Sequence, residues 1–417
     1  MSKEKIVLAY SGGLDTSIIL TWLKEELDYS VIAVCVDVGQ IQDFDALKKK
    51  ALSTGAEKVY VANVKEEFLT DYAFKGLKAD AVYEDDYLLG TAYSRPLIAK
   101  ILVDIAIKEN AVGIAHGATG KGNDQVRFET AIKSLAPHLK VIAPWRTWNF
   151  KSRIELLEYA KTHNIPIPPK KEDNYSMDDN LWHISHEGND LESTTNSHKS
   201  SMYKKIKPLS EADDVGEDIK ITFKQGIPVA VNDKQMNAVD LVEMLNDKAG
   251  LHGVGVIDIV ENRLVGMKSR GVYESPAATV LYKAHRLLEK ITLDKATMHF
   301  KKILSLRYAE LVYDGLWFSP LKKGFDAFFD KIQEWVTGDV YLKLYKGNVM
   351  NMGITSPYSL YSESLVTFDG GSGYNQGDAT GFINLHSLSL RVCTQVRGNS
   401  DLQQKDYEYS FAVKEEK

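Results

Sequence analysis

Short runs of consecutive apolar residues alternate with segments of helical periodicity along the first part of the chain, and this alternation constrains the fold most. Residues 6–10 and 31–36 are apolar at nearly every position, as expected of strands buried on both faces. The pattern predicts further strands at 58–64, 112–115 and 141–143, and helices at 18–27, 45–52, 97–108 and 154–163. Strands that alternate with helices need crossover connections, so the sequence predicts an α/β fold with a parallel sheet covered on both faces.

A glycine-rich loop joins the first expected strand to the first expected helix, with the sequence Ser11-Gly12-Gly13-Leu14-Asp15-Thr16-Ser17. Ligands of parallel sheets collect at the carboxyl ends of strands, where helix N-termini offer N–H groups to phosphate. Gly12 and Gly13 let the backbone approach an anion closely. A carboxylate repels phosphate unless a cation lies between them, so we interpret Asp15 as a ligand of Mg²⁺. The loop lacks the Lys-Ser/Thr ending of a Walker loop, and a simple capped turn is the alternative.

The pattern changes after residue 164. The proline-rich stretch 165–171 is expected to be a linker, and the polar stretch 189–205 a surface excursion. The second part is expected to be α+β, with a hairpin at 219–231, helices at 239–245, 277–290 and over much of 292–335, and a strand at 340–352. Apolar residues at helical spacing predict a helix at 379–396, which docks on a neighbouring subunit or on its own domain.

We therefore expect three regions in the chain. They are a nucleotide-binding domain at 1–168, a synthetase and oligomerisation domain at 169–378, and a C-terminal helical arm and tail at 379–417.

The composition excludes several classes of protein. Hydrophobic residues make up 44% and charged residues 26% of the 417 positions, as in globular proteins. The net charge of −6 argues against a nucleic-acid partner. No apolar run is long enough for a membrane span, and the two cysteines, Cys35 and Cys393, form no CxxC pair. Since the N-terminal apolar stretch is also too short for a signal peptide, we expect a cytoplasmic protein without a membrane partner.

Four further segments carry side chains suited to an amino acid substrate. They are HGATGKGNDQVRFE at 116–129, YLLGT at 87–91 with Arg95, the stretch from Tyr175 to Ser185, and VENRLVGMKSRGVYE at 260–274. A zwitterion needs an anion for its ammonium and a cation or donor for its carboxylate, and these segments offer both.

The motifs carry a family resemblance. SGGLDTS resembles the pyrophosphate loop of the N-type ATP pyrophosphatases, which split ATP between the α and β phosphates and adenylylate a substrate oxygen. With the two long segments HGATGKGNDQVRFE and VENRLVGMKSRGVYE, the chain resembles the argininosuccinate synthase family from Lys5 to beyond Arg391. The resemblance implies a ligase that joins citrulline to aspartate through citrullyl-AMP and releases AMP and pyrophosphate. It also implies ATP as a cofactor and a homotetramer, while Mg²⁺ is expected from the presence of Asp15 in the loop.

The resemblance implies roles for individual residues. It assigns ATP binding to Ala9, Tyr10, Ser11, Gly12, Gly13, Leu14, Asp15, Thr16, Ser17, Val36 and Gly117. It assigns aspartate binding to Thr119, Asn123 and Asp124, and citrulline binding to Tyr87, Asn123, Arg127, Ser176, Ser185, Glu261 and Tyr273. Ala92 also belongs to the expected citrulline set, although the family usually has a serine at this position. If that serine contacts citrulline, this chain either replaces the hydrogen bond or binds more weakly by about 1 kcal/mol. The expected catalytic set is Asp15, Ser17, Asp124 and Arg127.

Several alternatives stay open. The base that takes a proton from the aspartate ammonium is His116 or Asp124, although a histidine at the end of a strand is more often structural than catalytic. The aromatic group Trp145, Trp148 and Phe150 is expected at a domain interface. One rival function is a tRNA-modifying adenylylating enzyme, which would need catalytic cysteines or a basic surface. The other is a nucleotide-binding protein without catalysis, which the intact loop argues against.

Overall fold

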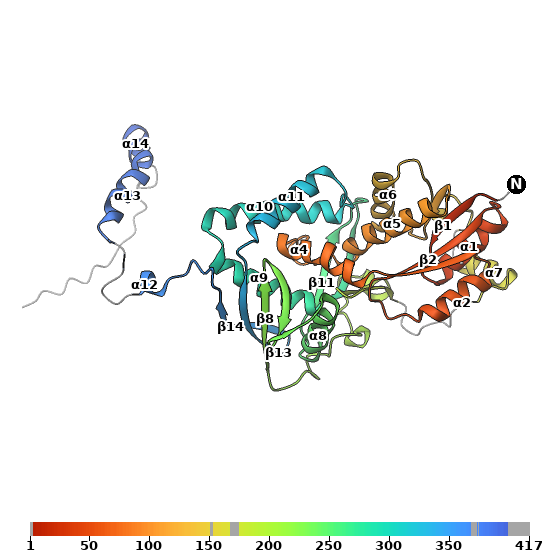
Figure 1. Ribbon diagram of the computed structural model, residues 1–417, viewed down its shortest axis with the longest axis horizontal. Coiled ribbons are helices and arrows are strands. Elements are labelled where there is room, and N and C mark those ends of the chain that lie inside the picture. The colour runs from red at the N-terminus through yellow and green to blue at the C-terminus, as the bar shows by residue number, and fades with distance from the viewer. Residues whose placement is uncertain (1–2, 151–152, 167–174, 368–372, 374, 399–417) are drawn as a thin grey trace, which may run out of the picture. The chain divides into compact units, whose positions relative to one another are not determined.

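The computed structural model describes residues 3–150, 153–166, 175–367, 373 and 375–398. Contacts divide the chain into two units, Met1–Leu360 and Tyr361–Lys417, which are described separately (Figure 1). Among the described residues, no helix is both long enough and apolar enough to cross a bilayer.

The first unit begins with a five-stranded parallel sheet in the order β3-β2-β1-β4-β5. Its strands are β1 (Lys5–Ala9), β2 (Ser30–Asp37), β3 (Lys58–Asn63), β4 (Gly113–Ala115) and β5 (Lys140–Ile142). The chain winds from β1 outwards to β3 and then returns to β4 on the other side of β1. The topological switch point therefore lies between β1 and β4, where parallel sheets bind their ligands.

Helices cover both faces of this sheet, as predicted (Figure 1). Ile6 and Leu8 of β1 pack with α1 (Leu14–Glu25) and α2 (Phe44–Thr54). Val7 points to the other face and packs with α5 (Gly90–Lys108) and α6 (Asp124–Leu135). This alternation explains why β1 is apolar at every inner position. Cys35 is a buried core residue, as the sequence suggested.

Two antiparallel sheets follow in the second part of this unit, in the orders β10-β9-β8-β13-β14 and β11-β12-β7-β6. The strands are β6 (Ser176–Asp179), β7 (Ile184–Glu187), β8 (Glu217–Lys224), β9 (Ile227–Val231), β10 (Lys234–Gln235), β11 (Val256–Asn262), β12 (Lys268–Glu274), β13 (Gly338–Tyr345) and β14 (Asn348–Thr355). The helices here are η3 (Asn189–Glu192), η4 (Ser200–Met202), α8 (Ala238–Leu251), α9 (Pro276–Thr292), α10 (Lys295–Tyr313) and α11 (Pro320–Ile332).

The two parts of the first unit interlock. Between β3 and α5 the chain forms α3 (Lys65–Glu67), η1 (Phe68–Ala73) and α4 (Phe74–Ala79), and α4 packs against α9, α10 and α11 (Figure 1). The last helices of the nucleotide-binding part are η2 (Pro144–Arg146) and α7 (Arg153–Thr162). One continuous core consequently joins α5 of the first part to α9 of the second.

Several local predictions were wrong. The expected strand at 340–352 is the hairpin β13–β14, which turns at Lys346 and Gly347 with positive φ angles of 42° and 80°. Helix α5 begins at Gly90 rather than at 97, because burial of Ala92 and Tyr93 stabilises turns that precede Pro96.

The aromatic group also lies elsewhere than predicted. Trp145, Trp148 and Phe150 pack with Leu14 of α1 and Leu156 of α7, inside the nucleotide-binding part rather than at a domain interface. The 189–205 stretch is more than a surface excursion, since Leu191 and Met202 are buried beside Val272 of β12. Most of the expected linker at 165–171 lies outside the described residues.

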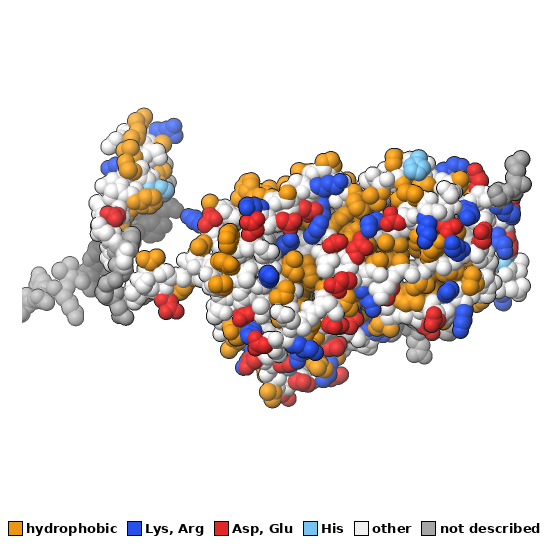
Figure 2. Space-filling model, in the orientation of Figure 1, with side chains coloured by type: hydrophobic (Ala, Val, Ile, Leu, Met, Phe, Trp, Pro, Cys, Tyr) orange, Lys and Arg blue, Asp and Glu red, His pale blue; other side chains and the backbone are white. Residues whose placement is uncertain are grey.

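The second unit contains α12 (Glu363–Val366), α13 (Asp378–His386) and α14 (Leu388–Arg397). The single helix expected at 379–396 is therefore wrong. The Ser387 hydroxyl donates to the carbonyl of Ile383 at 2.7 Å, a back-bond that bends helices at such breaks. Apolar side chains are exposed along both α13 and α14 (Figure 2), namely Phe382, Ile383, Leu385, Leu388, Leu390, Val392 and Val396.

Candidate functional site

The glycine-rich loop leads directly from β1 into the first turn of α1. Gly13 is the N-cap of α1 and, as a glycine, has no side chain with which to cap the helix. The Ser17 hydroxyl donates to the Gly13 carbonyl at 2.8 Å and lies 3.2 Å from the Tyr10 hydroxyl. These bonds hold the loop in shape, and the N-terminal turn of α1 is open to an anion.

The loop after β4 lies against the loop after β1. A Cβ atom at Gly117 would stand 3.2 Å from the Cγ2 of Thr16 and 3.3 Å from the Cδ1 of Ile19. Only a small residue at 117 leaves this approach unobstructed. The predicted ATP residues at 9–17 and Gly117 thus meet at the switch point. Val36, the last residue but one of β2, lies at the same edge with its side chain buried.

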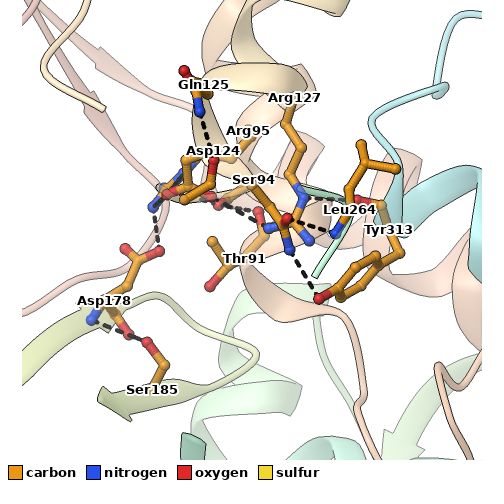
Figure 3. Close-up of polar contacts among 12 residues, drawn as sticks. Thr91, Ser94, Arg95, Asp124, Gln125, Arg127, Asp178, Ser185, Leu264 and Tyr313 are labelled. Atoms are coloured by element: carbon orange, nitrogen blue, oxygen red, sulfur yellow. Dashed lines mark hydrogen bonds and ion pairs between the residues drawn. The ribbon is translucent and has the colours of Figure 1, made fainter. Parts of the chain in front are cut away.

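Arg95 of α5 joins two carboxylates from distant segments. Its Nε and Nη2 atoms donate to Oδ2 of Asp124 at 2.9 and 2.8 Å, and Nη2 also pairs with Asp178 of β6 (Figure 3). Asp124 also accepts from Arg127 Nη1 at 3.3 Å, and the Asp178 backbone N–H donates to Ser185 Oγ at 3.2 Å. The cluster connects the first turn of α6 with the β6–β7 hairpin.

The two carboxylates differ in basicity. Burial alone would raise the pKa of Asp124, but the guanidinium groups of Arg95 and Arg127 outweigh burial and lower it. Burial raises the pKa of Asp178, and its one guanidinium partner, Arg95, does not compensate. Asp178 is therefore the stronger proton acceptor of the pair.

An aromatic pocket lies beside this cluster. The ring centroid of Tyr87 is 4.7 Å from that of Tyr273, and His183 stacks on Tyr273 at 5.6 Å. Tyr313, at the end of α10, stands edge-on to Tyr87 at 6.1 Å. The Tyr273 hydroxyl donates to Oε1 of Glu261 at 3.2 Å.

Two side chains of opposite charge, Arg127 and Glu261, each have a buried polar atom without a hydrogen-bond partner among the described residues. Within the described part of the chain, Nη2 of Arg127 and Oε2 of Glu261 form no hydrogen bond although both are buried. Burial raises the pKa of Glu261 to about 7. The Arg127 Nε atom donates to the Tyr313 carbonyl at 2.9 Å, which fixes the direction of its guanidinium (Figure 3). Since unsatisfied buried groups are costly, such a pair suits the carboxylate and ammonium of an amino acid.

The turn between β11 and β12 closes over the 117–124 segment. The Leu264 backbone N–H donates to Oδ1 of Asn123 at 3.0 Å, while Nδ2 of Asn123 donates to the Tyr313 hydroxyl at 2.8 Å (Figure 3). Arg263 adds a bond from Nη1 to the Lys121 carbonyl at 3.4 Å. Asn123 thereby ties three segments together.

The structure brings most of the predicted substrate residues together. Tyr87, Asn123, Asp124, Arg127, Ser185, Glu261 and Tyr273 belong to the connected groups described above. Ala92 is fully buried in α5, one residue after Thr91, whose hydroxyl lies 2.8 Å from His183 Nε2. Thr119 is exposed in the 117–124 segment, and Ser176 is exposed at the start of β6, outside the partly buried cluster of Arg95, Asp124 and Asp178.

His116 has structural partners. It is fully buried, its Nδ1 atom accepts from the Ala118 N–H at 3.3 Å, and its Nε2 atom lies 3.3 Å from Glu129. Its ring also stacks on Phe128. These contacts favour the structural role over the catalytic one.

Three residues of the site had no role in the sequence interpretation. Asp178 and His183 lie within the segment from Tyr175 to Ser185, whereas Tyr313 lies outside every motif. The one sequence signal for Asp178 is its position two residues after Ser176, within a substrate motif. Tyr313 ends an ordinary amphipathic helix, so no local pattern distinguishes it.

Comparison with known proteins gives consistent matches along the chain. The family model for the "Arginosuccinate synthase N-terminal HUP domain" matches residues 5–166, and that for the "Arginosuccinate synthase C-terminal domain" matches 175–393. A protein of Alkaliphilus metalliredigens named argininosuccinate synthase is 59% identical over 391 residues, or 94% of each chain. Proteins of the same name from Caldanaerobacter subterraneus and Moorella thermoacetica are 60% and 59% identical over 389 residues, covering 93% of this chain and 95% of theirs.

Proposed function

Because this chain belongs to the argininosuccinate synthase family, we propose that it uses ATP to join citrulline to aspartate, with AMP and pyrophosphate as the other products. The observation that carries the proposal is the position of the aromatic pocket relative to the phosphate loop. The pocket shares the 117–124 segment with the phosphate loop, because a Cβ atom at Gly117 would meet Thr16, while Asn123 bonds Leu264 and Tyr313.

ATP binds with its phosphates at the first turn of α1. The residues at 9–17 and Gly117 surround that turn, and the helix dipole and backbone N–H groups favour the anion. Val36 lies towards the adenine at the end of β2.

The donor set around Asp15 fits Mg²⁺. Asp15 is a partly buried carboxylate in the first turn of α1, beside the expected phosphates. Mg²⁺ is usually held by one or two carboxylates together with substrate phosphates and water. When bound, the ion would neutralise charge on the pyrophosphate group as it leaves.

Citrulline occupies the aromatic pocket between Tyr87 and Tyr273. Its carboxylate takes the open Nη2 donor of Arg127, and its ammonium takes Oε2 of Glu261. Ser185 and Asn123 complete the polar wall, and Ser176 contributes from β6. Thr119, Asn123 and Asp124 bind aspartate.

The reaction needs two substitutions and no protein nucleophile. The ureido oxygen of citrulline attacks the α-phosphorus of ATP, and the bond to pyrophosphate breaks. The aspartate amine then attacks the ureido carbon, and AMP departs with the C–O electron pair. Positioning of three substrates and charge stabilisation by Arg95, Arg127 and the loop provide the catalysis, while Asp15 and Ser17 hold the phosphate end.

The aspartate ammonium must lose a proton before it attacks. Asp178 is the better acceptor, since its pKa is raised by burial, whereas the pKa of Asp124 is lowered by two guanidinium groups. Asp124 is better suited to hold the ammonium by charge.

The decisive experiment measures pyrophosphate release from Mg²⁺-ATP while citrulline and aspartate are omitted in turn. We expect release that requires citrulline, with AMP and argininosuccinate formed once aspartate is added. Release stimulated by tRNA alone would favour the tRNA-modifying alternative. ATP binding without release under any combination would favour the non-catalytic one.

The assembly and location of the protein are further parts of this proposal. The exposed apolar side chains of α13 and α14 are suited to a homotetramer in which this arm contacts other copies. We also propose that the protein works in the cytoplasm, where its substrates are handled.

A further inference from the structure

Lys50 contacts the phosphate loop although it lies in a different helix. Its Nζ atom, from the second half of α2, donates to the Gly12 carbonyl at 2.6 Å. Helix α2 is packed closely here, since a Cβ atom at Gly12 would stand 2.1 Å from the Cδ1 of Leu47. The position of this ammonium is thus set by the packing of α2 on the loop.

Lys50 differs from the lysines that precede it. Lys48 and Lys49 are exposed, whereas Lys50 is partly buried, and burial lowers its pKa. Among the described residues no carboxylate forms an ion pair with the Lys50 ammonium, and its bonded acceptor is a neutral carbonyl. A partly desolvated cation without a counter-charge is energetically unfavourable, and a bound anion would stabilise it.

The bond to Gly12 also orients the loop. In a planar trans peptide the C=O and N–H groups point in opposite directions. By holding the Gly12 carbonyl towards α2, Lys50 turns the Gly13 N–H away from α2. Gly12 has a φ of 72°, a conformation that glycine adopts without strain, so the peptide can take this orientation freely.

We propose that Lys50 is a positioning residue of the phosphate loop, which supplies from α2 the positive charge that the sequence of the loop itself lacks. It favours the β and γ phosphates of ATP and the departing pyrophosphate, both through its charge and through the orientation of the Gly12–Gly13 peptide. The inference rests on the proposed use of ATP by this site.

The test compares Lys50→Met, Lys50→Gln and Lys50→Arg in the full-length protein, with Lys49→Met as the matched control on the same helix. The readouts are KM for ATP, KM for citrulline and the inhibition constant of inorganic pyrophosphate. We expect Lys50→Met to raise KM for ATP and the pyrophosphate constant by roughly ten- to a hundredfold, as for a lost charge-assisted hydrogen bond. KM for citrulline should change less than about threefold, as befits a site without contact to Lys50.

The other variants separate charge from orientation. Lys50→Arg should retain most of the affinity for pyrophosphate, and Lys50→Gln should fall between Arg and Met, because it retains a donor without charge. Lys49→Met should match the wild type. Equal affinities for ATP and pyrophosphate in the wild type, Lys50→Gln and Lys50→Met would overturn the inference, as would a parallel rise in KM for citrulline.

Direct binding separates this inference from the proposed function. If the wild type releases no pyrophosphate with citrulline and aspartate, the proposed function fails. Titration calorimetry with inorganic pyrophosphate then still tests Lys50, with the same expected order of wild type, Arg, Gln and Met. Should Lys50→Met not fold, the comparison of Lys50→Arg with Lys50→Gln decides.

Discussion

The pKa of Glu261 makes citrulline binding depend on pH. The Glu261 side chain is buried, with 5% of its surface exposed, and burial raises its pKa to about 7. Arg127 opposes this shift, whereas the nearby Glu187 carboxylate reinforces it. In the proposed complex Glu261 holds the citrulline ammonium, and only the ionised carboxylate can do so with full strength.

The magnitude follows from the ionised fraction of Glu261. At pH 6 only about one tenth of the free enzyme carries the ionised carboxylate, so KM for citrulline should be about tenfold above its value at high pH. At pH 8 the carboxylate is about nine-tenths ionised, and KM should lie close to its minimum. KM for aspartate should not follow the same curve, because Asp124 keeps a lowered pKa.

The free energy of unfolding should fall as pH rises, whereas the affinity for citrulline rises. Between the ordinary pKa of 4.5 and the folded value of about 7, the folded state binds a proton that the unfolded state releases. The stabilisation is fully present below the lower value and is lost as pH rises through the upper one, by about 3 kcal/mol in all. Glu261→Gln removes this dependence, and the free enzyme of the variant should therefore unfold with less variation across the range.

The assay measures initial rates of pyrophosphate release from about pH 5.5 to about pH 8.5, with ATP and aspartate saturating. Glu261→Gln should raise KM for citrulline at high pH and flatten the profile. Urea unfolding of both proteins over the same range checks the stability trend. A wild-type KM for citrulline that stays constant between pH 6 and 8, or an identical profile in Glu261→Gln, would refute the reasoning.

Three further predictions concern the loop and the arm. Asp15→Asn should suppress pyrophosphate release by at least about a hundredfold while thermal unfolding stays near that of the wild type; near-normal turnover would remove Asp15 from the mechanism. Gly12→Ala places a Cβ atom 2.1 Å from the Leu47 Cδ1 at a φ of 72°. It should lower the free energy of unfolding by about 1–3 kcal/mol and raise KM for ATP, as measured by urea titration and initial rates. Deletion of residues 379–417 should dissociate the proposed tetramer, and an unchanged sedimentation profile would contradict that.

The sequence predicts the nucleotide-binding part well, because its strands and its phosphate loop are each recognisable from short stretches of sequence. Continuous apolar runs mark the strands of a sheet covered on both faces, and the loop after β1 identifies itself by its glycines and its position. The prediction from hydrophobic periodicity was wrong where the same pattern continues through a turn. Alternation runs through 340–352 without a break, and Lys346-Gly347 was the one sign of the hairpin.

The site was harder to predict because its contacts cross long stretches of sequence. Arg95, Asp124 and Asp178 come from α5, α6 and β6, and nothing local to any of them announces the other two. The aromatic residues Trp145 and Trp148 show the same limit: apolar surface indicates burial but not the partner, which proved to be α1 and α7.

The bonds of Asn123 make the substrate pocket depend on distant parts of the chain. Its side chain bonds Leu264 and Tyr313, residues that follow it in the chain by 141 and 190 positions. The phosphate loop is built from the first part of the chain alone, whereas the substrate pocket needs residues from both parts. The second part could therefore not be exchanged without loss of the substrate pocket and disruption of the core that α5 and α9 share.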